Sequence, residues 1–573
     1  MKQTLKLIPQ PFRRRGIGVA LSLFVKAALN LIGLAMLLPV LALALDPESL
    51  TGEGLLAQFY RAVGFRSAEQ FAWFTAGVIV GVIALKSFLT LLLSRIERRY
   101  IYDLYTALSR RLYTTYHRRG LPFIKSQNSA VLSRNVNVVC LSFTAGVLKP
   151  AAMICSETML LVLLFTALAI YAPLASLLTL MIFLPAMWGY YRYVRRRINR
   201  YGEEENRAQR EKSRVVAETF RGFTDVELND AFPMMLRRFD VAMKEVVRTR
   251  SKEADIALLP QMVTELGLAI GISLLAALSF SLGMGEGSSQ LLFGIFAVAA
   301  IRLMPSVRNI LSAWTTIRYN RYTIQILKDA PAEEQEEEAT APIEALPFER
   351  AIEIRGLKFR FWDGEEELFG GLNLSIRKGE HLGFRGTSGA GKTTLFNLLL
   401  GFYTPTEGEI LIDGEPLTAE NRRRWQQRVG YVSQSLFLTD GTFAENVALG
   451  LSDKEIDRER VLEVLEMAQL GDFVRSLEKG IDTRVGECGC RLSGGQRQRI
   501  GIARALYRHA DVLFFDEATS SLDSATEQEI NHSIARLASE NKSLTLLVIA
   551  HRETSLEACD RVITIDHNPI HHV

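Results

Sequence analysis

The sequence predicts a protein of two parts, an α-helical membrane domain with six spans followed by an α/β domain. Long apolar segments are confined to the first part of the chain, and an acidic stretch, Glu333–Glu338, follows them. Beyond it, short β-like runs alternate with amphipathic helical stretches. A chain of 573 residues is also too long for one hydrophobic core, since domains usually run to roughly 100 to 200 residues. We therefore expect a transmembrane domain over 1–330, an acidic linker over 331–348 and an α/β domain over 349–573.

Six apolar segments are long enough to cross a bilayer, for which about 20 residues suffice. They lie at residues 16–45, 71–96, 151–171, 174–191, 256–282 and 291–314. Only Tyr171, Ala172 and Pro173 divide the third segment from the fourth, and a proline can also kink one continuous helix. The first segment is far longer than the core of a signal peptide, so we expect it to remain as a membrane anchor.

The distribution of charge predicts which side of the membrane each segment faces. Arg13, Arg14 and Arg15 precede the first span, whereas the loop after it is net acidic, and basic residues favour the cytoplasmic side. The net charge of +4 is therefore better explained by membrane topology than by a nucleic-acid partner. Two long helical connections should then extend into the cytoplasm. Their breaks near Leu121–Gln127 and Phe220–Asn229 are either contact points for a motor domain or ordinary surface turns.

Several ionisable residues lie well inside the predicted spans, among them Lys86, Glu157, Glu265 and Arg302, while Lys26 could reach the membrane surface with its long side chain. Charged groups are costly in lipid and usually face an aqueous cavity or a partner. Each of these side chains is therefore expected either to form a structural salt bridge or to contact a transported molecule.

The strongest chemical signal is the segment Gly386–Thr393, which matches the phosphate-loop pattern GxxxxGK[ST] in full. It follows the strand-like run His381–Phe384 and precedes a helical stretch. Its glycines let backbone N–H groups turn towards phosphate oxygens, and the helix presents its positive end to them. Lys392 is expected to reach the β and γ phosphates of a nucleotide, and the Thr393 hydroxyl is expected to help hold Mg²⁺.

A second signal is the apolar run from Val512, which ends in Asp516 and Glu517. An aspartate at the carboxyl end of a buried strand can orient the metal, and the following glutamate can polarise an attacking water. Together with the phosphate loop, this pair predicts a P-loop NTPase that hydrolyses its nucleotide.

The pentapeptide Leu492-Ser493-Gly494-Gly495-Gln496 lies between these two motifs, and it resembles the signature of ABC transporter ATPases. The resemblance extends across the whole chain and indicates a half-transporter of the ABC exporter class (type IV). It implies that the signature of one subunit faces the nucleotide held by another, so two copies, a homodimer, would enclose ATP and Mg²⁺. A Ser-Gly-Gly turn that opens a helix is also a ready anion site.

The resemblance also assigns roles to single residues. Gln434 corresponds to the Q-loop glutamine, His551 to the switch histidine and Asp523 to the D-loop aspartate, while Phe361 stands where the family has an adenine-stacking tyrosine. A phenylalanine keeps the aromatic face, so ATP binding should survive. Residues expected at the nucleotide are Phe361, Gly386, Thr387, Ser388, Gly389, Ala390, Gly391, Lys392, Thr393, Thr394, Gln434, Ser493, Gly494, Gly495, Gln496 and Asp523, with Thr393, Gln434 and Asp516 at the metal and Glu517 and His551 in catalysis.

Within the exporters, the membrane half most resembles bacterial lipid-linked oligosaccharide flippases of the PglK type. The matching features are Arg302–Ser306, Leu259–Gln261 and an amphipathic stretch after the first span. That family is thought to use basic cavity residues for the pyrophosphate of its substrate. Lys86 and Arg302 match basic positions, whereas Gln261 replaces an arginine, and these three are the expected substrate residues.

These features predict an ATP-hydrolysing flippase that moves an amphipathic, polyprenyl-pyrophosphate-linked oligosaccharide outward across the cytoplasmic membrane. Two alternatives remain: an exporter of drugs, peptides or glycolipids with the same motor, and an ATP-gated channel or regulator. A heterodimer with another half-transporter is a further possibility, although none of the motifs in this chain is degenerate.

Overall fold

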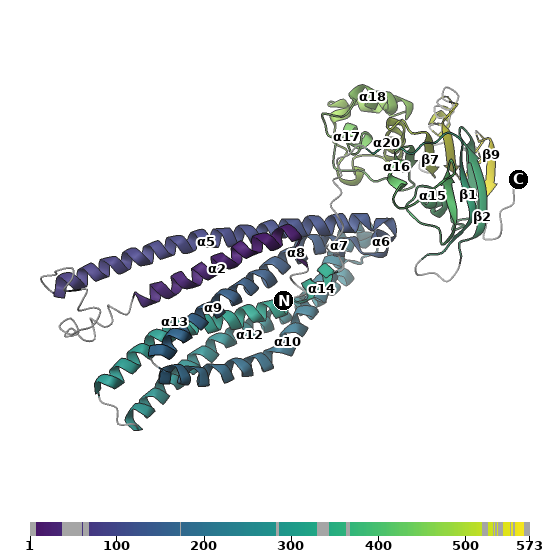
Figure 1. Cartoon of the computed structure of the whole chain (residues 1–573). Coiled ribbons are helices and arrows are strands. Elements are labelled where there is room, and N and C mark those ends of the chain that lie inside the picture. Colours follow the sequence, from purple (N-terminus) through teal and green to yellow (C-terminus); the bar gives the residue numbers. More distant parts are fainter. Residues whose placement is uncertain are drawn as a thin grey trace. The chain divides into compact units, whose positions relative to one another are not determined.

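The computed structural model divides into two compact units, Met1–Gln335 and Glu336–Val573, which are described separately (Figure 1). It describes residues 7–36, 60, 68–171, 173–281, 286–328, 343–361 and 367–517, and further on 525, 527–530, 532, 536, 542–550, 552–553, 556–557 and 559–565. The acidic stretch Glu333–Glu338 and the amphipathic stretch after the first span lie outside these residues, apart from the helical Tyr60.

Each of the six predicted spans lies at least partly within a long helix of the first unit. These helices are α2 (Gln10–Ala35), α5 (Ala68–Arg118), α9 (Lys149–Tyr171), α10 (Pro173–Arg221), α12 (Phe232–Ser281) and α13 (Glu286–Tyr319). Among the described residues, four stretches are long and apolar enough to cross a membrane: Gln10–Gly33, Glu69–Arg118, Ser129–Ile170 and Phe232–Ala277. The fourth and sixth predicted spans, in α10 and α13, are helical but are not among these four, so their membrane crossing stays a prediction.

Several of these helices are far longer than a membrane requires. α5, α10 and α12 contain 51, 49 and 50 residues, whereas about 20 cross a bilayer core. The excess carries many charged side chains, such as the run Arg195–Arg197 in α10, which water solvates far better than lipid. Figure 1 shows these helices as long rods, with α10 beside α12 and α5 beside α2.

Short helices join the long ones at the places where the sequence breaks its periodicity. α6 (Gly120–Ser126) and α11 (Phe223–Leu228) lie at the two predicted breaks, and Phe223 and Leu228 expose most of their side-chain surface. The segment between α6 and α9 alternates between α and π geometry. Its parts are α7 (Ser129–Arg134), η2 (Asn135–Val139), α8 (Cys140–Phe143) and η3 (Thr144–Leu148), and α14 (Tyr322–Lys328) follows α13.

The packing of α10 against α13 depends on one close approach. A Cβ atom built on Gly202 in α10 would lie 1.9 Å from the carbonyl oxygen of Tyr319, at the end of α13. Around this contact Val194, Ile198, Val307 and other apolar side chains form a buried cluster. Only a residue without a side chain lets the two backbones come this close.

The described residues of the second unit form two sheets. The antiparallel sheet has the order β2-β1-β4-β5, and the other has the order β6-β7-β8-β3-β9, with every pairing parallel. The strands are β1 (Ala351–Phe359), β2 (Phe369–Arg377), β3 (His381–Arg385), β4 (Glu407–Ile412), β5 (Glu415–Pro416), β6 (Val429–Val432), β7 (Val512–Asp516), β8 (Thr545–Ile549) and β9 (Arg561–Thr564). The helices are α15 (Lys392–Leu399), α16 (Arg422–Gln426), α17 (Phe443–Val447), α18 (Arg458–Met467), α19 (Gly471–Ser476) and α20 (Gly494–Tyr507), with 3-10 turns η4 (Gly480–Asp482) and η5 (Glu487–Gly489).

Buried aromatic rings fix α15 against the parallel sheet. Phe396 of α15 packs edge-on against Phe384 of β3 and Phe514 of β7, with ring centroids 5.7 and 5.0 Å apart. Edge-to-face pairs of this kind add about 0.5–1.5 kcal/mol beyond the area that they bury. Because the strands are parallel, their carboxyl ends lie along one edge, and the segments after β3, β6 and β7 begin there.

We expect Gly202→Ala to weaken the packing of α10 against α13, because the added methyl group meets the backbone at Tyr319. Overpacking of this kind costs about 1–3 kcal/mol. Thermal unfolding of the purified full-length protein should show the loss. Gly189→Ala in the same helix is the matched control, since nothing lies within 4 Å of its Cβ position. Equal stability of the two variants would contradict the close approach.

Candidate functional site

The phosphate loop joins the carboxyl end of β3 to the amino end of α15. Gly391, the residue before the helix, has φ +92°, and a Cβ on it would crowd the side chains of Leu368 and Phe369. At the other end, a Cβ on Gly386 would lie 2.1 Å from the carbonyl oxygen of Ile565. The loop can therefore keep this path only with glycine at both positions.

Lys392 and Thr393 form the first turn of α15 and point in different directions. The buried Lys392 ammonium donates to the carbonyl oxygens of Gly386 and Thr387 at 2.8 and 3.0 Å, so its charge lies over the loop. The Thr393 hydroxyl donates to Asp516 Oδ1 at 3.1 Å. A cation and a hydroxyl therefore flank the helix terminus, which itself favours anions.

Asp516 at the end of β7 accepts hydrogen bonds on both carboxylate oxygens. Tyr431 of β6 donates from its hydroxyl to Oδ2 at 3.2 Å, opposite the Thr393 hydroxyl on Oδ1. Burial raises the pKa of Asp516, which is 1% exposed, and these two donors act in the opposite direction. The pKa of Tyr431 is also raised, first by burial and then by the carboxylate beside it. Two donors therefore fix the orientation of this carboxylate.

The pair Thr393 and Asp516 is suited to Mg²⁺. In the described part of the chain, no three His, Cys, Asp or Glu side chains gather as a full metal cage. Mg²⁺ does not need one, because it usually keeps waters and takes substrate phosphates together with one or two protein oxygens. The hydroxyl and carboxylate beside the phosphate loop fit that kind of site.

Glu517 lies one residue beyond Asp516 and has an unusual backbone. Its φ is +52°, a left-handed conformation that is uncommon outside glycine, asparagine and aspartate. Its N–H donates to the carbonyl of Ile549 at 3.0 Å, and Gln434 Nε2 donates to its Oε2 at 2.7 Å. The segments after β6 and β7 therefore bring these two side chains together.

The signature pentapeptide begins α20. Ser493 accepts from the N–H of Gln496 at 3.2 Å, and its own N–H donates to Gln496 Oε1 at 2.9 Å. This reciprocal pair is a capping box, which explains why serine and glutamine stand three residues apart. Ser493 is exposed, and Gly494 and Gly495 form the first turn of the helix.

Phe361 belongs to an aromatic cluster just past β1. Its ring lies 5.1 Å from Phe359 and 6.0 Å from Tyr403, both edge-on, while Phe359 and Tyr403 stack at 5.5 Å. The carbonyl of Phe359 also accepts from the N–H of Leu368, whose side chain borders Gly391. Phe361 therefore lies near the phosphate loop, since it contacts Phe359, which bonds to Leu368, and Leu368 borders Gly391.

Two predicted site residues, His551 and Asp523, lie outside the described residues. The strand that leads to His551 is present as β8, and it ends at Ile549 on the same edge as the other site segments. The assignments of both residues stay predictions.

The three predicted substrate residues occupy different helices of the first unit. The Lys86 side chain of α5 packs towards α2, where a Cβ on Gly33 would lie 2.8 Å from its Cδ. Gln261 donates to Glu265 one turn along α12 at 2.8 Å. Arg302 lies in α13, and its side chain is outside the described residues.

Glu157 is another ionisable group of the predicted spans with visible partners. Its two carboxylate oxygens accept from Ser306 at 2.7 Å and from Asn309 at 2.9 Å, so α9 is bound to α13 beside Pro305. Its contacts in this part of the chain are polar and neutral rather than a salt bridge.

Tyr431 is the site residue that the sequence did not point to. A tyrosine in a short apolar strand is ordinary core, and its role appears only because β6 pairs with β7 in parallel, with Tyr431 opposite Phe514. The available signal was its place three residues before Gln434.

The two sheets, the phosphate loop and the capped signature helix define an ATPase unit of the ABC transporter class. The family model for ABC transporters matches residues 369–520. A relative from Bordetella pertussis, named ATP-dependent lipid A-core flippase, is 31% identical over 517 residues, which is 88% of this chain and 80% of that protein. The chain therefore belongs to the ABC transporter family.

Other relatives are also named ATP-dependent lipid A-core flippase. The protein from Francisella tularensis subsp. tularensis is 35% identical over 365 residues, which is 61% of this chain and 58% of that relative's length. Among solved structures, a bacterial Atm1-family ABC exporter with ATP bound superimposes with a TM-score of 0.78 at 24% identity, covering 97% of this chain and 94% of that one. The chain therefore shares its fold with this exporter.

We expect Tyr431→Phe to raise the Mg²⁺ concentration needed for half-maximal ATP hydrolysis by about tenfold, because the metal-site carboxylate loses one of its two orienting donors. Titrating Mg²⁺ at saturating ATP measures the change. Tyr507→Phe is the control, since its hydroxyl accepts from the N–H of Asp457 on another part of the unit. An unchanged Mg²⁺ requirement in Tyr431→Phe would show that the hydroxyl plays no such role.

Proposed function

We propose that this chain is one half of a homodimeric ATP-driven exporter or flippase in the cytoplasmic membrane. The observation that carries the proposal is the meeting of Lys392, Thr393, Asp516 and Glu517 at one sheet edge, in a chain whose other unit holds membrane-length apolar helices. In this assignment residues 1–330 form the membrane domain, and 349–573 form the motor domain in the cytoplasm, joined by the linker 331–348.

In the proposed reaction, the phosphate loop and Lys392 neutralise the β and γ phosphates of ATP, while Thr393 and Asp516 contribute oxygens to Mg²⁺. Mg²⁺ supplies positive charge at the phosphates when it is bound. Glu517 then positions and polarises the attacking water, once Gln434 gives up its hydrogen bond. His551 would contact the γ-phosphate, which is the role that the family resemblance assigns to it.

The dimer follows from the place of the signature turn. The contacts of Ser493 lie within its own turn, and it is exposed, so its remaining hydrogen-bonding capacity faces outward. In the proposed assembly Ser493 and the N–H groups of Gly494 and Gly495 contact the nucleotide of the second copy. Closing the dimer on two ATP molecules would move the long cytoplasmic helices.

A lipid is the proposed substrate. The named activity of the Bordetella and Francisella relatives supports a lipid rather than a small soluble molecule. The narrower proposal is a polyprenyl-pyrophosphate-linked oligosaccharide, with Lys86 and Arg302 as its cations and Gln261 beside them. A glycolipid exporter is the second candidate, and the same relatives favour it.

The proposal of an ATP-gated channel or regulator without turnover is weaker. Such a protein does not need a carboxylate beside the metal site, whereas here Glu517 stands next to Asp516 and is held by Gln434. Measurable ATP hydrolysis by the purified protein is the simplest observation that separates the two.

We expect Glu517→Gln to abolish ATP turnover, with a loss of at least about a hundredfold, while ATP binding remains, because the amide cannot take the proton of the attacking water. Phosphate release and equilibrium ATP binding by the purified full-length protein are the two measurements. Glu478→Gln, an exposed carboxylate of the same unit, should leave both unchanged. A fully active Glu517→Gln protein would remove this residue from the proposed reaction.

We expect Arg302→Leu to impair lipid flipping in proteoliposomes by about tenfold and basal ATP hydrolysis by less than twofold, because a cation in the span contacts the lipid phosphate rather than the nucleotide. The assay compares a polyprenyl-pyrophosphate oligosaccharide with a glycolipid in the same vesicles. Arg237→Leu, an exposed arginine of the cytoplasmic part of α12, is the control. Equal flipping by Arg302→Leu and wild type would exclude the proposed contact.

A further inference from the structure

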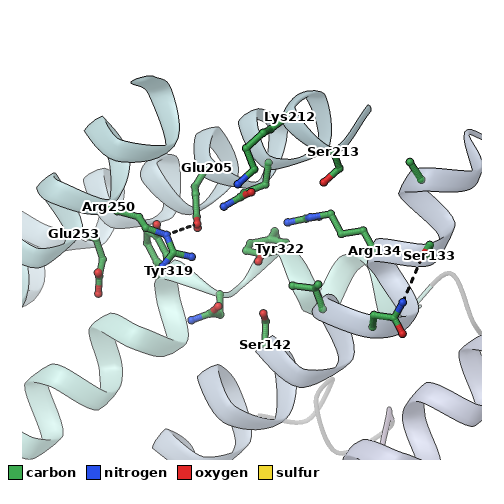
Figure 2. A pocket seen from close by; sticks show the side chains of 15 residues that line it. Ser133, Arg134, Ser142, Glu205, Lys212, Ser213, Arg250, Glu253, Tyr319 and Tyr322 are labelled. Atoms are coloured by element: carbon green, nitrogen blue, oxygen red, sulfur yellow. Dashed lines mark hydrogen bonds and ion pairs between the residues drawn. The ribbon is translucent and has the colours of Figure 1, made fainter. Parts of the chain in front are cut away.

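A polar pocket of about 670 Å³ lies in the first unit, away from the predicted spans. Its walls come from the segment after α6, from α10, from α12 and from the end of α13 (Figure 2). The pocket contains three cationic side chains, Arg134, Lys212 and Arg250, and two carboxylates, Glu205 and Glu253. Neither the resemblance nor the proposed transport reaction assigns a role to it.

The carboxylate nearest the middle of the pocket already has its counter-ion. Glu205 of α10 is 4% exposed and accepts from Arg250 Nε of α12 at 2.8 Å. This pair joins two of the long helices and accounts for one positive and one negative charge. Glu253 lies on the same helix as Arg250, and Figure 2 shows it on the far side of that arginine from Arg134.

Arg134 is a buried cation that attracts Glu205 across the pocket without forming a direct ion pair with it, since Glu205 contacts Arg250. It is 9% exposed, and its hydrogen bonds go to neutral groups, namely the amide oxygen of Asn206, at 2.8 Å from Nη1, and the hydroxyl of Tyr322. Within the described part of the chain, no carboxylate lies at ion-pair distance from it. A buried guanidinium normally has an anionic partner, because desolvation costs several kcal/mol when no opposite charge offsets it.

Lys212 of α10 adds a second cation to the same space. It is half-buried, lines the pocket beside Ser213, and makes no ion pair with any described residue. Figure 2 shows both Arg134 and Lys212 directed into the pocket, with the Ser213 and Tyr322 hydroxyls near them. Cations and hydroxyl donors together make the usual protein surroundings of a phosphate group.

The backbone around Arg134 is also unusual. Arg134 ends α7, and the following residues Asn135–Val139 form a π-helix whose Asn137 and Val138 line the pocket. Single π turns inside helices occur frequently at functional sites. Here the π turn follows directly on Arg134, which α7 presents to the pocket.

From this geometry we infer that the pocket binds the phosphate group of an anionic ligand, through Arg134 and Lys212 with Ser213 as a further donor. The group could belong to a phospholipid headgroup or to a soluble phosphate compound, because both present the same oxygens. The inference does not rest on the proposed function, since it concerns binding at a place distant in sequence from every nucleotide-site residue.

The test measures phosphate binding to the purified full-length protein at saturating ADP, which keeps the phosphate loops occupied. Equilibrium dialysis with labelled inorganic phosphate tests the soluble source. Lipid retention from phosphatidylcholine nanodiscs with and without phosphatidic acid tests the lipid source. We expect one bound phosphate group per chain in at least one arm, and the arm that shows it identifies the source.

Lys212→Gln should weaken this binding by about tenfold, which is the effect expected from losing one charge-assisted hydrogen bond. Arg134→Gln should weaken it at least as much. Because Arg134 is buried, the half-exposed Lys212 provides the variant that folds most safely. Arg214→Gln is the matched control: it lies two residues further along α10, is exposed and pairs with Glu218, so binding should change less than twofold.

Two results would overturn the inference. Either the wild-type protein binds no phosphate probe in either arm, or Lys212→Gln and Arg134→Gln bind as tightly as Arg214→Gln. Neither readout involves ATP turnover or transport, so failure of this inference is distinguishable from failure of the proposed function.

Discussion

The buried carboxylate of Asp516 is the point on which the motor unit depends. Removing a carboxylate from water is costly, and the cost is offset here by two hydroxyl donors from different elements, Thr393 of α15 and Tyr431 of β6. These bonds hold the helix after the phosphate loop and the strand before Gln434 in fixed relation to β7. The phosphate loop, the loop that carries Gln434 and the chain that continues into Glu517 therefore keep fixed positions relative to one another, because the Asp516 carboxylate bonds to the first two segments and directly precedes the third.

In the membrane unit the corresponding constraint is close approach between helices rather than charge. α10 and α13 meet at Gly202, where the backbone of Tyr319 leaves no room for a side chain. That contact lies beside the pocket lined by Tyr319 and Glu205, so the tight crossing and the polar cavity occur on the same pair of helices. Charged side chains beyond the spans can then be held in defined places, as Arg250 is by Glu205.

Much of the candidate nucleotide site could be predicted from the sequence, because its motifs are short and continuous along the chain. The phosphate loop is a continuous pattern, and β3 and α15 lie where it places them; likewise Asp516 ends the strand that its apolar run predicts. Tyr431 could not be found in this way, since its partner is 85 residues away and only strand pairing brings them together. The same holds for Arg134 and Asn206, which are 72 residues apart. A sequence pattern identifies residues that function together with their neighbours along the chain. It does not identify residues whose partners are distant in sequence and become neighbours only when the chain folds.

The hydrogen bond between Gln434 and Glu517 bears on when ATP can be hydrolysed. In the proposed reaction Glu517 accepts a proton from water, and an amide bonded to its carboxylate would hinder this step, so ATP hydrolysis would be suppressed while the bond lasts. Gln434 stands on the loop after β6, and Glu517 is held by its backbone bond to Ile549. A movement that displaces this loop would break the hydrogen bond and free the Glu517 carboxylate. The rate of ATP hydrolysis would then depend on the movement of the loop rather than on the concentration of ATP.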